Sequence, residues 1–171
     1  MSSHLVMLAL VLFAAADAPP APRVRSSHPY IRAMIAEAQV RSPSFRRLVA
    51  AIEATDGIVY VEEGECHHHV RACLPPVVTS TADVRVLHVL VDARQEDWNV
   101  MADIAHELQH ALEVLVDRNA RTNDRVFFLI QPATVMTRDA VETDAAVKAG
   151  DTVRREVAAF ARNASTKGQS R

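Results

Sequence analysis

The sequence predicts an α+β fold, in which helices and strands occupy separate stretches of the chain. Apolar residues recur at helical spacing over residues 28–53, 97–117 and 137–161. Residues 57–92 instead contain runs rich in β-branched residues, bounded by Gly and Pro, as is typical of strands. The predicted order is two helices, a small antiparallel three-stranded sheet, a third helix, a connector and a last helix.

The chain has 171 residues, which is long enough for one domain with a hydrophobic core, and we expect that domain to span residues 28–163. Residues 19–27 are rich in Pro, Arg and Ser and are predicted to form a mobile leader, and residues 164–171 are predicted to form a polar tail. The net charge of −2 provides no basic field, so no nucleic-acid partner is expected. No feature of the sequence predicts an oligomeric state.

Residues 1–18 are predicted to be a secretory signal peptide. The run "LVMLALVLFAAADA" has an apolar part of about a dozen residues, shorter than the roughly 20 that a membrane span needs. Small residues and then "PPAP" follow, which is typical of a cleavage site, although no Lys or Arg precedes the run. An uncleaved anchor and a buried N-terminal helix are the alternatives. We therefore expect an exported protein, periplasmic or secreted, with no membrane span once the signal is removed.

Two helices are predicted before the sheet. Ser27 can cap the first, which runs from His28 towards Val40 with Pro in its first turn. Its apolar face is Ile31, Met34, Ile35 and Ala38. Ser42 and the following Pro begin a second helix, and Gly57 is placed to end that region. The apolar face of the second helix is Phe45, Leu48, Val49 and Ile52.

Three strands are predicted next, in the stretches "GIVYVEEGE", "LPPVVTST" and "DVRVLHVLVD". The third is apolar on both faces and is therefore expected to be largely covered. Between the first two lies "GECHHHVRACLPP", which holds both cysteines of the chain, Cys66 and Cys73. Export favours a disulfide between them, closing a hairpin. Free thiols, or a metal site that also uses His67, His68 and His69, are the alternatives.

The helix predicted after the strands carries the order H-E-x-x-H. Asp97 is a plausible N-cap, and the helix runs from Trp98 to about Asp117. On a helix His106 and His110 share one face, so two imidazoles can bind one Zn²⁺. Glu107 projects beside that ion, where it can accept a proton from metal-bound water. The alternative is a solvated polar face on an amphipathic helix.

A connector over residues 118–136 contains one apolar run, "VFFLI". Thr137 can cap a last helix that reaches about Ala161. In this helix residues 142, 146, 149 and 153 form one stripe, which is small and apolar except for Glu142. A carboxylate on such a face would be buried and would need a partner, which makes Glu142 a candidate metal ligand. The alternative is an ordinary surface glutamate.

The stretch "HELQHALEV" resembles the active-site helix of the zincin metallopeptidases. The order of sheet, H-E-x-x-H helix, connector and glutamate-bearing helix is similar to the gluzincin branch, including small exported bacterial members, over roughly residues 57–162. The resemblance implies a minimal zincin-like domain with a Glu as third zinc ligand. Glu142 is our choice, with Asp144 and Glu156 behind it. Gluzincins often carry an Asp four residues after this Glu, and Ala146 stands there instead.

Two further residues complete the predicted site. Glu113 lies too far along the helix for direct ligation, so we expect it to hydrogen-bond a ligand imidazole or a neighbouring helix. A peptidase also needs a donor for the oxyanion. The options are His88, on the strand nearest in sequence to the motif, and Tyr30, Tyr60 or Arg125. For His88 the favoured alternative is a half-buried strand histidine without a role in the reaction.

Three functions are compatible with the sequence. The first is an exported zinc metallopeptidase that acts on a peptide or protein, aligned by strand addition on the third strand. The second is a zincin-like domain that binds zinc without turnover. The third is a periplasmic metal-binding protein that uses His67–His69. The chemistry requires a divalent ion, and Zn²⁺ is the expected cofactor.

Overall fold

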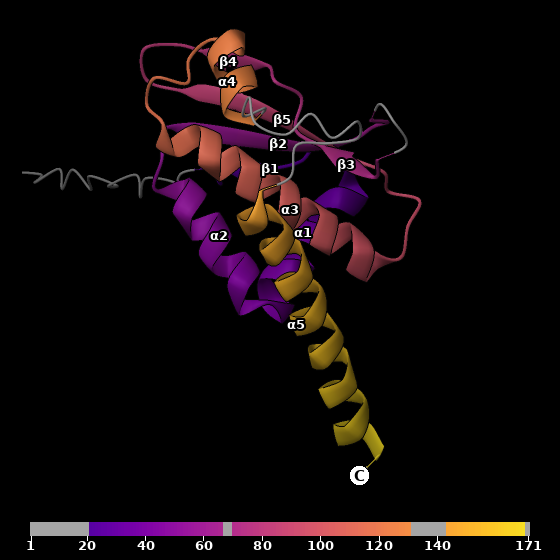
Figure 1. Ribbon diagram of the computed structural model, residues 1–171. Coiled ribbons are helices and arrows are strands. Elements are labelled where there is room, and N and C mark those ends of the chain that lie inside the picture. The colour runs from indigo at the N-terminus through magenta and orange to yellow at the C-terminus, as the bar shows by residue number, and fades with distance from the viewer. Residues whose placement is uncertain (1–20, 67–69, 131–142, 170–171) are drawn as a thin grey trace, which may run out of the picture.

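Helices and strands occupy separate layers of the computed structural model, which describes residues 21–66, 70–130 and 143–169 (Figure 1). Five helices and five strands lie in these residues, so the predicted α+β class is confirmed. The helices α1, α2 and α3 lie below the sheet in the view of Figure 1. None of the helices in these residues combines the length and hydropathy needed to cross a bilayer.

The sheet is mixed and is not the predicted antiparallel three-stranded sheet. It contains β1 (Val24–Arg25), β2 (Gly57–Glu63), β3 (Ala72–Cys73), β4 (Val78–Ser80) and β5 (Arg85–Val91), in the order β1-β2-β5-β3, and β4 also pairs with β5. The two long strands β2 and β5 are parallel, with Gly57 opposite Arg85 and Glu63 opposite Val91. β3 and β4 pair antiparallel with the other edge of β5.

The alternation of apolar residues in β2 and β5 explains why these strands pair, and also why the sequence did not reveal that they are parallel. In parallel register Val59 lies beside Leu87 and Val61 beside Val89, and all four side chains are buried on the face that the helices cover. The alternation predicts which residues face the core but is the same for either strand direction. Strand direction is decided by the tertiary structure, in which β5 begins beside the start of β2, with Arg85 opposite Gly57. The opposite face of β5 is only half-buried, so the strand is not covered on both sides.

The strand β1 lies in the segment that the sequence suggested was a mobile leader. It pairs parallel with β2, and Val24 is buried. The backbone N–H of Val59 donates to the carbonyl of Arg23 at 2.8 Å. A strand of two residues is too short for a periodic signal, so only the tertiary structure reveals it.

Helices α1 (Pro29–Arg41) and α2 (Pro43–Glu53) bury the residues that their spacing predicted. The N-cap of α1 is His28 and not Ser27, since its ring accepts from the Ile31 N–H. Ser42 caps α2 through the Phe45 N–H at 3.0 Å. Gly57 does not end α2; it begins β2, where a Cβ would overlap the Leu115 side chain. Its role is therefore close approach of the sheet to α3.

Helix α3 (Asp97–Val116) is the most buried helix of the described chain and carries the H-E-x-x-H residues. Its first residue, Asp97, is not the N-cap, which is Glu96. Asp97 instead accepts a hydrogen bond from the Tyr30 hydroxyl at 2.8 Å. This contact ties the beginning of α3 to α1.

The other end of α3 is held by Arg85, whose side chain is only 1% exposed. Its guanidinium donates to the carbonyls of Leu115 at 2.6 Å and Asp117 at 2.7 Å, and to the Asp56 carboxylate. The cation thus satisfies the last carbonyls of the helix at the negative end of its dipole. Hydrogen bonding from Arg85 outweighs desolvation and holds the pKa of Asp56 below its ordinary value. Arg121 contacts the same carboxylate at 2.8 Å.

The apolar run "VFFLI" lies in a helix, α4 (Asn123–Ile130), and not in an unstructured connector. Thr122 caps it through the Arg125 N–H at 3.3 Å, and Val126 is its buried contact. Phe127 and Phe128 are exposed. Five consecutive apolar residues show no helical period, which is why the pattern did not identify this helix.

Helix α5 (Asp144–Gln169) packs along α3 and then continues past the rest of the domain (Figure 1). The predicted start at Thr137 lies outside the described residues. The described helix begins after Thr143, whose hydroxyl accepts from the Ala146 N–H at 3.1 Å. It extends beyond the predicted end at Ala161, into the segment expected to be a polar tail. Its buried face contains Ala146, Gly150, Val153 and Val157.

Glu156 fastens α5 to the beginning of α2. Its carboxylate accepts from the Ser42 hydroxyl, and from the Ser44 N–H and hydroxyl at 3.0 and 2.8 Å. Burial by itself would raise the pKa of Glu156, but these hydrogen bonds and the charge of Arg47 outweigh it and lower the pKa. The contact therefore depends on the ionised carboxylate.

Replacing Arg85 by Met should lower the free energy of unfolding by about 3 kcal/mol, because it leaves Asp56 and the last carbonyls of α3 without their buried donor. Urea unfolding followed by circular dichroism measures this difference. The control is Arg94→Gln, which breaks an exposed pair with Asp92 and should leave stability unchanged. Equal effects of the two substitutions would show that Arg85 does not hold the helix end.

Acid should weaken the contact between α5 and α2. A carboxylate whose pKa is lower in the folded than in the unfolded state stabilises fully above the unfolded value, 4.5 for Glu156, and loses that contribution as the pH falls through the folded value. Glu156→Gln should therefore be less stable than wild type at pH 7 and lose less stability on acidification. Urea midpoints at pH 7, 4.5 and 3 test this. The exposed Glu65→Gln should follow the wild-type profile.

Candidate metal centre

The three motif residues lie in the middle of α3, where the helix is covered on several sides. The side chains of Glu107 and His110 are nearly buried, with 6% and 5% residue exposure, and His106 is half-buried. A solvated helix face would expose all three, so that alternative is wrong. Buried polar groups need partners, which indicates a structured site.

The two imidazoles lie side by side on α3. The ring centroids of His106 and His110 are 5.0 Å apart and their planes meet at 70°. Each imidazole binds Zn²⁺ through one nitrogen at about 2.0–2.1 Å, so rings at this separation can reach one ion between them. The donor set of two imidazoles beside a buried carboxylate fits zinc or a similar divalent ion.

Glu113 makes the contact with the motif that its position predicted. One carboxylate oxygen lies 3.3 Å from His110 Nδ1. The other accepts from the Thr143 hydroxyl at 2.9 Å and from the Gln109 amide at 3.3 Å. A carboxylate that holds one ring nitrogen orients the imidazole and directs Nε2 away from itself, as is common for histidines that bind metals. Glu113 also joins the motif to the N-terminus of α5.

A face of α5 with small residues lies directly against the motif. The predicted stripe is right for Ala146 and Val153, but Gly150 and not Ala149 is buried between them. A Cβ on Gly150 would lie 3.2 Å from the Ala102 carbonyl oxygen and 3.3 Å from the Cβ of His106. Ala146 and Val153 are buried on the same face. Any side chain at position 150 would therefore make tight contacts with α3, and glycine relieves them where α5 approaches His106.

The predicted third ligand, Glu142, lies outside the described residues and directly precedes Thr143 in the chain. His67, His68 and His69 also lie outside them. Within the described ranges, no group of three or more His, Cys, Asp or Glu side chains is arranged to hold a metal ion. Of the two reserve candidates, Asp144 is exposed and Glu156 is bound at the start of α2. Glu142 stays a prediction.

None of the four suggested oxyanion donors lies beside the motif. His88 stacks on Tyr60 at 5.5 Å and lies 2.9 Å from Glu62, on the sheet face opposite the buried side chains of Leu87 and Val89. Helix α3 covers the sheet face of Leu87 and Val89, so His88 points away from the motif. The assignment of His88 as oxyanion donor is therefore wrong.

Tyr30 and Arg125 are engaged elsewhere. Desolvation, reinforced by the hydrogen bond to Asp97, raises the pKa of Tyr30 to about 12. Asp97 is nine positions before His106, about 13 Å along the helix, so Tyr30 is bound far from the motif. Arg125 pairs with Asp117 at 2.7 Å, beyond the other end of α3.

Sequence reasoning missed an ion pair of the nearly buried Asp103, one helical turn before Glu107. The Arg71 guanidinium donates a hydrogen bond of 3.3 Å to one oxygen of Asp103 and lies 3.3 Å from the other, which accepts from the Gln95 amide at 3.1 Å. Arg154 of α5 lies 3.8 Å from the same carboxylate. A signal was present: Asp103 stands alone in an apolar stretch, four positions before Glu107 and hence on the same helix face.

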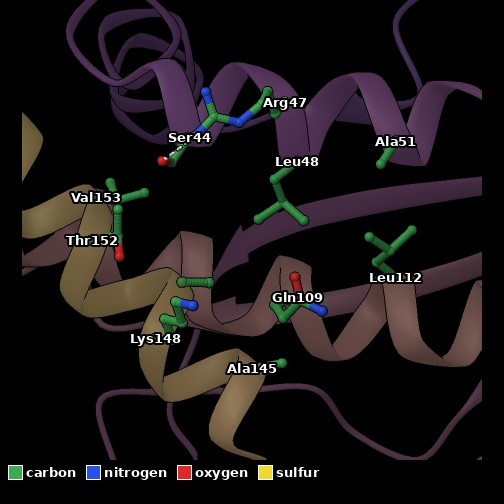
Figure 2. Close-up of a pocket in the computed structure, with 11 residues that line it drawn as sticks. Ser44, Arg47, Leu48, Ala51, Gln109, Leu112, Ala145, Lys148, Thr152 and Val153 are labelled. Atoms are coloured by element: carbon green, nitrogen blue, oxygen red, sulfur yellow. Dashed lines mark hydrogen bonds between the residues drawn. The ribbon is translucent and has the colours of Figure 1, made fainter.

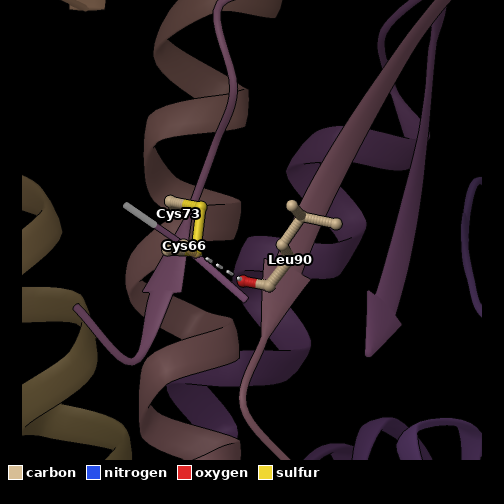
Figure 3. The surroundings of a disulfide bond; sticks show 3 residues. All are labelled: Cys66, Cys73 and Leu90. Carbon is tan, nitrogen blue, oxygen red and sulfur yellow. Dashed lines mark hydrogen bonds between the residues drawn. A yellow bond between two sulfur atoms is a disulfide. The ribbon is translucent and has the colours of Figure 1, made fainter. Parts of the chain in front are cut away.

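The predicted disulfide is confirmed and helps to place Arg71. Cys66 and Cys73 are bonded with their Cα atoms 6.0 Å apart (Figure 3). It does not close a hairpin, because β3 pairs with β5 and not with β2. The bridge ties the segment after β2 to the edge of the sheet. The Arg71 carbonyl accepts from the Asp92 N–H at 2.8 Å, so this loop is fixed where its guanidinium meets α3.

The central strand β5 has partners on both edges, with β2 on one and β3 and β4 on the other. Strand addition of a peptide along β5 is therefore excluded.

Comparison of the chain with protein-family models, with curated proteins and with solved structures finds no match.

Replacing Gly150 by Val should separate α5 from the motif and lower the free energy of unfolding by about 1–3 kcal/mol, the usual cost of overpacking. Urea unfolding measures the loss, and the imidazole signals of His106 in NMR spectra should shift. The control, Ala161→Val, places the same side chain on the exposed part of α5 and should change neither. Unchanged His106 signals in Gly150→Val would contradict the close approach.

Proposed function

We propose that the protein is an exported zinc-dependent hydrolase, and most simply a small metallopeptidase of the zincin type. The observation that carries the proposal is the buried H-E-x-x-H turn, with imidazoles 5.0 Å apart and a carboxylate on His110 Nδ1. The resemblance of "HELQHALEV" to the zincin helix supports it, and the Cys66–Cys73 disulfide is consistent with an oxidising compartment.

The residues of this chain have separate roles in the proposed reaction. His106 and His110 would hold Zn²⁺, with Glu142 as the third protein ligand. When bound, such an ion would supply a water molecule with a pKa near 7. Glu107 would act as the general base and then as the acid towards the leaving amine. Glu113 keeps the imidazole of His110 oriented, and the substrate is a peptide or protein.

A second candidate is a zincin-like domain that binds zinc without turnover. It is favoured by one observation: the four residues suggested as oxyanion donors are bound elsewhere or lie on the wrong face of the sheet. A metal-binding loop at His67–His69 is the third candidate. Metal content separates the helix from the loop, and hydrolysis separates the first two candidates.

Metal analysis of the purified mature protein should find one equivalent of zinc in wild type and none in His106→Ala or Glu142→Ala. His88→Ala, on the opposite face of the sheet, should keep the metal. Circular dichroism controls for the fold of each variant. Equal metal in all four proteins would remove the helix site and favour the histidine loop.

Glu107→Gln should keep zinc and fold but reduce hydrolysis of an unstructured protein by about 100-fold or more, the usual effect of losing a general base. A chelator should abolish wild-type activity, and added zinc should restore it. If wild type binds zinc yet cleaves no peptide above the Glu107→Gln background, the binding-domain candidate is correct. If cleavage persists in Glu107→Gln, the assigned base is wrong.

A further inference from the structure

A groove of about 480 Å³ lies between α2 and α5, with α3 as its floor (Figure 2). It is distinct from the metal centre. The floor residues Gln109 and Leu112 lie two and five positions after Glu107, which places them about 160° and 140° around the helix from that side chain. The groove therefore occupies another side of α3 from the motif carboxylate.

The groove has an apolar lining. Leu48 and Ala51 come from α2, Leu112 from α3, and Ala149 and Val153 from α5. The groove is open because the alanine side chains on its walls are small, and leucine side chains line it (Figure 2). Its volume lies in the range of about 300–1,000 Å³ typical of small-molecule sites.

The charges in the groove are all positive. Two lining residues are charged, Arg47 of α2 and Lys148 of α5, and none is acidic. Arg47 donates to the Ser44 hydroxyl at 2.8 Å, and its charge acts on Glu156, so it is partly neutralised. Lys148 is exposed and forms no ion pair with any residue in the described ranges. An anionic group in the groove would therefore meet Lys148.

We propose that this groove binds a small amphiphile with one apolar chain and one carboxylate. The chain lies against Leu48, Leu112 and Val153, and the carboxylate pairs with Lys148. Burial of the chain supplies the attraction, and the ammonium selects an anion over a neutral head group. This proposal does not rest on the proposed hydrolase activity, since no motif residue lines the groove.

Occupancy is also linked to the motif by a short chain of contacts. Gln109 lines the groove, and its amide donates to Glu113 at 3.3 Å. The other oxygen of Glu113 lies 3.3 Å from His110 Nδ1. A ligand that displaces the Gln109 amide thus acts on the residue that orients His110.

Isothermal titration of the full chain with octanoate tests the proposal, with 1-octanol as the neutral chain-matched probe and acetate as the head group alone. Octanoate should bind saturably with one molecule per chain, and both other probes should bind more weakly. Lys148→Gln should weaken octanoate binding by about five-fold, the effect of one ion pair at a protein surface, and should leave 1-octanol unchanged. Arg162→Gln, an exposed cation on the same helix, should change neither.

A second variant obstructs the space without altering the core. Ala145 lines the groove yet is exposed, so Ala145→Trp should abolish octanoate binding while urea unfolding stays as in wild type. Absence of saturation, equal affinity for octanoate and 1-octanol, or unchanged binding by Lys148→Gln would overturn the proposal. A concentration-dependent dimer in light scattering, insensitive to octanoate and lost in Ala145→Trp, would assign the groove to a second copy of the chain and overturn it too.

Discussion

The hydrogen bonds from Arg85 to the last carbonyls of α3 fix the helix on which the rest of the structure depends. Arg85 begins β5 and is buried, so the sheet itself supplies the cation that closes the helix end. At the opposite end Tyr30 holds Asp97. Hydrogen bonds at both ends thus position α3, and with it His106, Glu107 and His110, relative to the sheet and α1.

Other elements contact α3 close to the motif. Gly150 brings α5 against His106, and the hydroxyl of Thr143 at the start of α5 reaches Glu113. On the preceding turn, Asp103 receives Arg71 from the disulfide loop. Polar side chains in a helix interior cost free energy unless they are paired. On this stretch of α3 Asp103 is paired with Arg71, and Glu113 is bound by Thr143 and lies beside His110.

Helix α5 contributes to both the candidate metal centre and the groove. One face covers His106 through Gly150, and another forms a wall of the groove through Ala149 and Val153. Glu156 holds the helix to α2, so the two sites have a common mechanical support. Any movement of α5 would change both, and the contact from Gln109 to Glu113 provides a direct connection between them.

The local features could be predicted from the sequence: the buried faces of α1 and α2, the disulfide, the helix with its H-E-x-x-H order and the contact of Glu113 with the motif. These depend on helical periodicity or on near neighbours in the chain. For α5 the predicted face was right at Ala146 and Val153 but had Ala149 in place of Gly150. Tertiary structure alone decided the parallel pairing of β2 and β5, the burial of Arg85, the pairing of Asp103 with Arg71 and the sheet face of His88. Each of these contacts joins residues at least 26 positions apart. The alternation of apolar and polar residues along a strand is the same for parallel and antiparallel pairing, so it cannot decide between them.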